Sequence, residues 1–122
     1  MESSPNNNKT LLDHNGHPSS ICVNYQKTIE FIGQKWVGMI IYTLLDGPKR
    51  YYELMEMIEG ISDRLLTERL NELVKEGLVK KQYLDGSLKK VQYELTPSGK
   101  GLQNIISAIH KWIEQKETLN NR

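Results

Sequence analysis

Apolar residues recur every three or four positions after Cys22, which is the spacing of helices that face a core. The first such run predicts helical core positions at Ile29, Ile32, Trp36, Met39, Ile40 and Leu44. Gly33 inside the run predicts two helices rather than one. Asp46-Gly47-Pro48 then predicts a stop, because glycine accepts left-handed geometry and proline cannot continue a helix. The next helix should therefore begin near Tyr51.

Two short helices separated by a tight turn are predicted next. Leu54, Met55 and Ile58 mark a helix that ends at Gly60, after which the Ser62 hydroxyl can cap another helix. That helix should end at Gly77 and bury one face, made of Leu66, Leu70, Leu73 and Val74. A pair of this kind, with a polar outer face on its second member, is the skeleton of a helix-turn-helix.

The segments 78–84 and 89–95 flank Asp85-Gly86-Ser87 and predict a β-hairpin. Polar and apolar residues alternate cleanly in the second strand and poorly in the first, so the register of the first strand stays open. Thr96-Pro97 pairs a capping hydroxyl with a first-turn proline and predicts a long helix to about Glu117. The expected fold is mostly helical α+β, a winged helix-turn-helix with a two-stranded hairpin wing and terminal dimerisation helices.

The 122 residues suit one ordinary domain. Residues 1–20 are rich in Asn, Ser, Pro and Gly and predict a flexible arm. Residues 21–117 should form the winged domain, with 118–122 as a disordered tail. No apolar run is long enough to span a bilayer and no secretion signal is evident, so we expect a cytoplasmic protein with no membrane partner.

The chain resembles the HxlR family of MarR-like winged-helix regulators in bacteria. The resemblance rests on Ile32-Gly33-Gln34-Lys35-Trp36, the run from Leu44 to Leu54, Gly60-Ile61-Ser62, Gly77-Leu78 and Tyr93-Glu94-Leu95-Thr96, with Leu66, Thr67, Leu70 and Leu73 between them. It covers residues 22 to about 113. Gln34 replaces a second glycine of the family pattern, and Val23 replaces the proline that commonly follows the cysteine. The resemblance implies a homodimer that binds operator DNA and regulates transcription.

The second helix of a helix-turn-helix presents its N-terminal end to the major groove. A rotation of about 100° per residue puts four polar side chains opposite or beside the buried face, and these are the predicted base contacts: Arg64, Thr67, Glu68 and Asn71. The alternative is a solvated polar face without a ligand.

Sixteen basic and fifteen acidic residues give a net charge of +1, which by itself indicates no partner. Lysines nevertheless gather on the hairpin, and glutamates gather elsewhere. The predicted phosphate contacts are Ser62, Lys49, Arg50, Lys89 and Lys90. For the lysines, the alternative is a solvated edge strand that discourages aggregation.

The last helix carries an apolar stripe that is long for a small core: Leu102, Ile105, Ile106, Ile109, Trp112 and Ile113. We expect Ile105, Ile109, Trp112 and Ile113 to pack against a second subunit, together with the first helix. The alternative is that the whole stripe folds back onto its own domain.

Cys22 lies at the expected N-terminus of the first helix, where the helix dipole favours the reactive thiolate. The family resemblance implies redox sensing, with an electrophile or oxidant as the possible effector. The alternative is a quiet, buried thiol. His14, His17 and Cys22 fit no standard zinc spacing, so we expect no metal and no cofactor.

No nucleophile motif or phosphate loop is present, which argues against an enzyme. Two other functions remain open. One is a winged-helix module that binds a protein, which the acidic Asp63 and Glu68 favour. The other is a small-molecule-responsive regulator with a pocket at the dimer interface.

Overall fold

The structure, a computed structural model, describes residues 20–86 and 90–121, with side chains from Val23 onward. The chain divides into two units between Gln34 and Lys35. The predicted arm, residues 1–20, lies outside the described residues except for its last position. The first unit contributes α2 (Ser20–Ile32), which ends where the Gly33 amide donates to the Ile29 carbonyl at 2.9 Å. The predicted break at Gly33 is confirmed.

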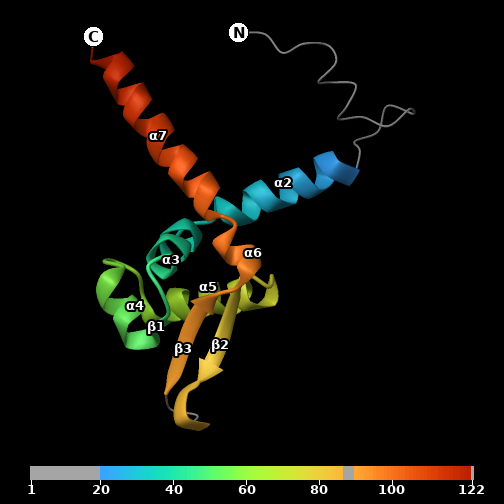
Figure 1. Cartoon of the computed structure of the whole chain (residues 1–122), viewed down its shortest axis with the longest axis vertical. Coiled ribbons are helices and arrows are strands. Elements are labelled where there is room, and N and C mark those ends of the chain that lie inside the picture. The colour runs from blue at the N-terminus through green and yellow to red at the C-terminus, as the bar shows by residue number, and fades with distance from the viewer. Residues whose placement is uncertain (1–19, 87–89, 122) are drawn as a thin grey trace. The chain divides into compact units, whose positions relative to one another are not determined.

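Three helices open the second unit: α3 (Val37–Leu44), α4 (Tyr51–Met57) and α5 (Asp63–Lys75) (Figure 1). The Leu65 amide donates to Ser62 Oγ at 3.1 Å, so the predicted cap of α5 is confirmed. α4 begins at Tyr51 as expected, but it ends at Met57 rather than at Gly60. Ile58 stops it early, because this residue takes an extended conformation (φ −104°, ψ 90°) while its side chain is buried.

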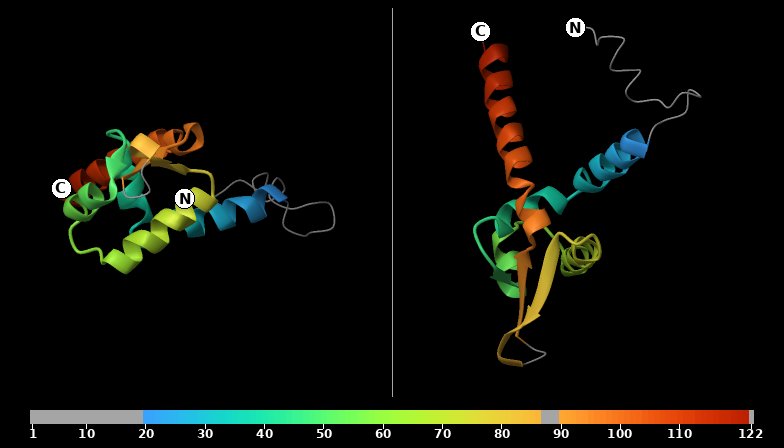
Figure 2. Two further views of the ribbon diagram at one scale, coloured as in Figure 1. Left: turned by 90° about the horizontal axis from the view of Figure 1, so that it is seen from below. Right: turned by 45° about the vertical axis from the view of Figure 1, so that its right-hand side comes forward.

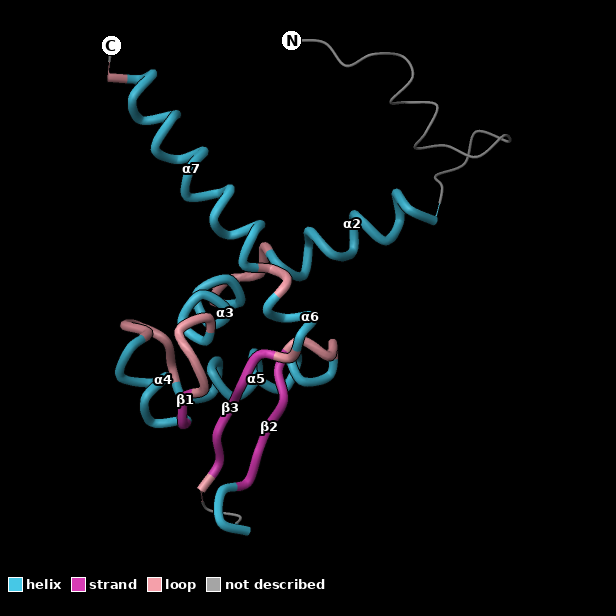
Figure 3. The backbone as a smooth tube through the Cα atoms, in the orientation of Figure 1, coloured by secondary structure: helices cyan, strands magenta, loops and turns pink. Residues whose placement is uncertain are grey.

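The hairpin pairs β2 (Val79–Tyr83) antiparallel with β3 (Val91–Leu95), as the backbone tube in Figure 3 shows. The register runs from Val79 opposite Leu95 to Tyr83 opposite Val91, which settles the strand that the sequence left open. A short 3₁₀ turn, η1 (Leu84–Gly86), follows β2, with φ of 55° at Asp85 and 67° at Gly86. Asp-Gly tolerates these left-handed angles, which explains the turn at this place.

The sheet has three strands, not the two expected. β1 (Lys49–Arg50) pairs antiparallel with β3, and the strand order is β1-β3-β2. Lys49 and Arg50 lie between the predicted stop at Asp46-Gly47-Pro48 and the helix expected from Tyr51, where no strand was expected. A strand of two residues has no alternation from which it could have been detected.

Successive side chains of a strand point to opposite faces of its sheet. Val79 and Leu95 are buried on the face that α3, α4 and α5 cover, and Figure 2 shows α5 beside β2. Met39 and Val74, both expected in the core, are 50% and 37% exposed. The apolar core consists of Val37, Ile40, Ile41, Leu44, Leu54, Ile58, Ile61, Leu66, Leu70, Leu73, Val79, Tyr93 and Leu95.

The predicted long terminal helix is broken into α6 (Pro97–Lys100) and α7 (Gln103–Asn120). Thr96 Oγ1 accepts from the Gly99 amide at 3.1 Å, as its predicted capping role requires. α7 continues to Asn120, so residues 118–120 are helical and not the disordered tail expected; no Gly or Pro after Glu117 stops the helix earlier. Within residues 20–86 and 90–121, no helix has both the length and the apolarity to cross a membrane.

Candidate nucleic-acid interface

α5 has one buried face and one polar face. Leu66, Leu70 and Leu73 are fully buried against the rest of the second unit. All four side chains predicted to contact bases are exposed on the remaining surface of the helix: Arg64, Thr67, Glu68 and Asn71. The structure therefore brings the predicted base contacts together on one accessible surface.

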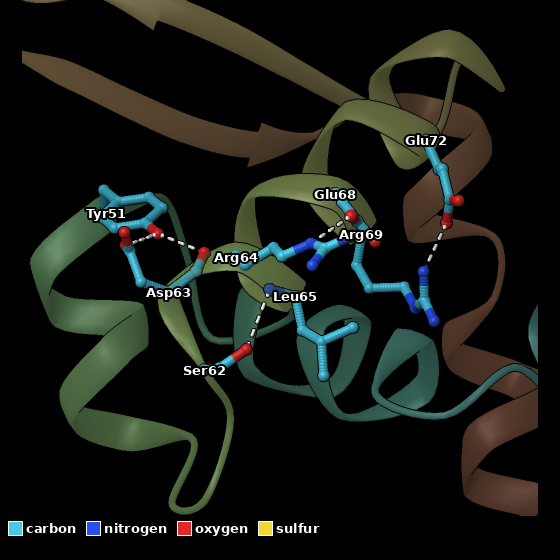
Figure 4. Close-up of polar contacts among 8 residues, drawn as sticks. All are labelled: Tyr51, Ser62, Asp63, Arg64, Leu65, Glu68, Arg69 and Glu72. Carbon is cyan, nitrogen blue, oxygen red and sulfur yellow. Dashed lines mark hydrogen bonds and ion pairs between the residues drawn. The ribbon is translucent and has the colours of Figure 1, made fainter.

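Arg64 and Glu68 form an ion pair one helical turn apart (Figure 4). Arg64 Nε lies 3.1 Å from Glu68 Oε2, and the two side chains are 88% and 46% exposed. Exposed pairs at this spacing contribute only about 0.3–0.5 kcal/mol. A bidentate contact between arginine and guanine is worth about 1–3 kcal/mol of discrimination, so Arg64 can exchange Glu68 for a base at a net gain.

Tyr51, which the sequence analysis did not select, connects α4 to the first turn of α5 (Figure 4). Its hydroxyl donates to the Asp63 carboxylate, lies 2.9 Å from the Asp63 carbonyl oxygen and 3.0 Å from Thr67 Oγ1. Burial raises the pKa of Tyr51 above 10.0, and the hydrogen bond to Asp63 raises it further, while the contact with Thr67 opposes the rise. The hydroxyl therefore stays protonated and engaged at neutral pH.

A second anchor holds α5 against the segment before α3. Arg69 Nε donates to the Lys35 carbonyl at 3.0 Å. Figure 4 shows the second contact of the same side chain, in which Arg69 Nη1 lies 3.3 Å from Glu72 Oε1. The Arg69 side chain is only 15% exposed. The contacts of Tyr51 with α5 and of Arg69 with Lys35 join residues that are 12 to 34 positions apart in the sequence. Periodicity reports only on neighbouring positions, so it could not predict either contact.

The predicted phosphate contacts are in different settings. Ser62 caps α5 and is exposed. The Lys49 side chain is only 12% exposed, with its ammonium 3.4 Å from Asp46 Oδ2 and 3.4 Å from the Gly47 carbonyl oxygen. Lys90 is exposed, 3.8 Å from Asp85 Oδ2. Lys89 lies outside the described residues.

Arg50 contacts α4 through both its backbone and its side chain. Its amide donates to Glu53 Oε1 at 2.8 Å, which caps the first turn of α4. Its guanidinium carbon lies 5.2 Å from the centre of the Tyr52 ring. Arg50 Nε is buried and has no hydrogen-bond partner in the described part of the chain.

α7 carries the predicted interface residues on its surface. Ile105, Ile109, Trp112 and Ile113 are 47%, 47%, 58% and 40% exposed. Leu102 and Ile106, at the start of the same stripe, are partly buried. Cys22 lies within the first turn of α2, where the sequence analysis placed it, and its side chain is outside the described set. Among the described residues, no three His, Cys, Asp or Glu side chains are grouped to hold a metal.

A helix-turn-helix followed by a hairpin and a terminal helix defines the class of winged helix-turn-helix transcription regulators. The model of one family in this class, described as HxlR-like helix-turn-helix, matches residues 31–120. The chain belongs to this family, as its sequence resemblance predicted.

Relatives of known sequence and structure agree with this assignment. The transcriptional regulator YodB of Bacillus subtilis (strain 168) is 37% identical over 97 residues, which span 80% of this chain and 87% of YodB. The solved structure of its reduced form matches with a TM-score of 0.68 at 38% identity, covering 74% of this chain and 88% of that one.

Two further solved structures are similar. A transcriptional regulator of the MarR family from Enterococcus faecalis V583 matches with a TM-score of 0.74 at 32% identity, covering 85% of this chain and 94% of that one. The redox regulator HypR in its oxidised form has a TM-score of 0.66 at 34% identity, covering 75% and 95%. YodB has also been solved bound to a quinone and after diamide treatment.

Proposed function

We propose that the protein binds an inverted-repeat operator as a homodimer and reads each half-site with α5. The exposed polar face of α5, beside a hairpin wing, is the observation that carries this proposal. Arg64 can bond guanine through its planar fork, and Asn71 can bond adenine. Thr67 and Glu68 lie on the same surface as further base contacts. Ser62, Lys49, Arg50, Lys89 and Lys90 are proposed to position the protein on phosphate.

The test is a footprint on the DNA upstream of the protein's own gene, followed by titration of the protected duplex. Arg64→Ala and Asn71→Ala should each weaken specific binding by about 1–3 kcal/mol and relax the base preference at one position. Arg64→Lys is the matched control, because it keeps the charge and loses the fork. If Arg64→Lys and Arg64→Ala behave like the wild type, α5 does not read bases through Arg64.

The stripe on α7 supports the homodimer. Side chains of this size that are about half exposed leave an apolar surface that a second copy can cover. In a two-fold dimer, both copies of α5 can enter successive major grooves about one helical turn apart. If the stripe instead packed onto its own domain, these side chains would have to be covered within the second unit.

We also propose that a thiol reaction at Cys22 changes operator affinity. Its place in the first turn of α2 supports this, because unpaired amides and the helix dipole favour the thiolate. The quinone-bound form of YodB and the oxidised form of HypR are consistent with an electrophile or oxidant as the effector. With one cysteine in the chain, oxidation would give a bond between subunits, a mixed disulfide or an adduct.

The experiment compares the wild type with Cys22→Ser for operator binding before and after diamide or a quinone. We expect the reagents to change binding by the wild type and to leave Cys22→Ser unchanged. Equal responses of the two proteins would mean that the signal enters elsewhere.

A further inference from the structure

A hollow of about 340 Å³ lies between the wing and the start of α4. Its walls come from all three strands and from the beginning of α4, and its lining residues are Arg50, Tyr51, Tyr52, Lys81, Val91 and Tyr93. Two cations and the polar edges of aromatic rings thus meet in one concave place. Tyr52 and Tyr93 were not among the predicted site residues, and Lys81 belonged to the hairpin lysines without being one of the predicted phosphate contacts.

The strand register shows which face of the wing this hollow occupies. Lys81 pairs with Tyr93, two positions along from the buried pair Val79 and Leu95. Because side chains alternate along a strand, Lys81 and Tyr93 share the face that the helices cover. The hollow therefore lies on the inner side of the wing. Tyr51 forms part of the wall of the hollow, and its hydroxyl donates to Asp63 in the first turn of α5.

In the part of the chain that the structure describes, the two cations of the hollow have no carboxylate partner, unlike other cations of the wing region. Lys80, on the outer face of β2, lies 3.4 Å from Glu94 Oε1. Lys49 and Lys90 are near Asp46 and Asp85. Among the described residues, Arg50 and Lys81 form no ion pair, and each lies over an aromatic ring instead, Tyr52 at 5.2 Å and Tyr83 at 5.6 Å.

The aromatic residues add uncharged hydrogen-bond donors and a wall of low polarity. Burial raises the pKa of Tyr93, the Lys81 ammonium opposes that rise, and Tyr83 adds to it, so Lys81 lies close enough to Tyr93 for their charges to interact. A protonated hydroxyl can donate to an anionic oxygen, and a wall of low polarity strengthens the attraction between a cation and that oxygen. The hollow is thus suited to a compact anion.

We propose that this hollow binds one phosphate of the DNA backbone, held jointly by Arg50 and Lys81 where the duplex passes between α5 and the wing. The proposal rests on the DNA-binding function proposed above and adds a specific phosphate clamp to it. Such a contact carries no sequence information and positions the duplex for α5. Lys81, rather than Lys80 on the outer face, becomes the lysine of β2 that contributes to affinity.

The test is a salt titration on a random-sequence duplex, with Lys81→Gln, Arg50→Gln and the double variant. Each phosphate that is neutralised contributes about 0.9 to the slope of log affinity against log salt. We expect Lys81→Gln, Arg50→Gln and the double variant each to lose about 0.9, because the phosphate is held only by the two cations together, whereas two independent phosphates would give a loss of roughly 1.8 in the double variant. Between about 50 and 200 mM salt, the affinity of the double variant should therefore fall by a factor about 3.5 times smaller than the factor by which the wild-type affinity falls.

Lys80→Gln is the matched control, since it removes the same charge from the adjacent position on the outer face. It should leave the slope near the wild-type value. Thermal melting of each variant checks folding, and Lys81→Gln tests the clamp alone if Arg50→Gln unfolds. Equal slopes for Lys80→Gln and Lys81→Gln would overturn the clamp while leaving operator binding intact. Absence of any salt-dependent duplex binding by the wild type would overturn the proposed function and the clamp together.

Discussion

Tyr51→Phe removes one hydroxyl and keeps the ring, so it isolates the hydrogen bond between α4 and α5. The hydroxyl bonds a charged acceptor, Asp63, and lies 3.0 Å from Thr67 Oγ1. A hydrogen bond to a charged group contributes about 1.5–3 kcal/mol, and a neutral one about 0.5–1.5 kcal/mol. Because Asp63 and Thr67 are exposed and water can replace the lost partner, we expect a total loss of about 1–2 kcal/mol.

The loss should lower the melting temperature by roughly 4–16 °C, since 1 kcal/mol corresponds to about 4–8 °C in a domain of this size. Tyr52→Phe is the control, because Tyr52 is the adjacent tyrosine and is 54% exposed. It should melt within a few degrees of the wild type.

The same change should weaken DNA binding through charge. Without the Tyr51 hydroxyl, the Asp63 carboxylate at the start of α5 is free to turn toward a DNA phosphate. Two like charges about 4 Å apart in water repel by about 1 kcal/mol, which weakens the affinity for DNA roughly fivefold. Adding Asp63→Asn to Tyr51→Phe should restore the affinity and not the stability. If Tyr51→Phe melts and binds DNA as the wild type does, the hydroxyl does not position α5 and this reasoning is wrong.

Three further predictions concern assembly, packing and pH. Ile109→Glu should shift the protein from dimer to folded monomer in analytical ultracentrifugation, because Ile109 is 47% exposed in the single chain, while Lys111→Glu on the same helix should stay dimeric. Gly99→Ala should destabilise by about 1–3 kcal/mol in chemical denaturation, since its Cβ would overlap the Leu78 carbonyl, whereas Gly38→Ala, with open space around it, should not destabilise. The contribution of Tyr51 to the free energy of unfolding should be constant below about pH 10 and fall as pH rises through the higher folded pKa of Tyr51, because the unfolded chain releases that proton first. The alkaline fall in the free energy of unfolding should be smaller in Tyr51→Phe, and an equal fall would contradict the assignment.

Local signals in the sequence were enough to predict most of the winged domain. Ser62 before an apolar face predicted the start of α5, and Asp85-Gly86 predicted the hairpin turn, because both depend on neighbouring residues only. The expected base contacts followed from the rotation of a single helix. The same reasoning failed for β1, whose two residues are ordered by pairing with a strand about forty positions later.

Partners of the charged side chains could not be predicted in this way. Lys80 and Lys81 are indistinguishable in the sequence, yet one pairs with Glu94 and the other lines the hollow. The difference follows from the register of β2, which the poor alternation of that strand left open. The contact of Tyr51 with Asp63 joins two helices across a turn and likewise has no local signature.

The distribution of partners explains how a chain of net charge +1 can present a surface suited to DNA. Asp63 is held by the Tyr51 hydroxyl, and Glu68 is held by an arginine that can leave it at little cost. Lys80 is compensated by Glu94 on the outer face, whereas Arg50 and Lys81, which line the hollow, form no ion pair among the described residues. Arg50 and Lys81 together neutralise one phosphate in the proposed clamp, so they count once toward non-specific binding, whose strength follows the number of phosphates neutralised. A phosphate contact is the same on any sequence, so the proposed base contacts of α5 would supply most of the difference between operator and other DNA. Discrimination should accordingly suffer more from Arg64→Ala than from Lys81→Gln, even where the two variants lose similar affinity.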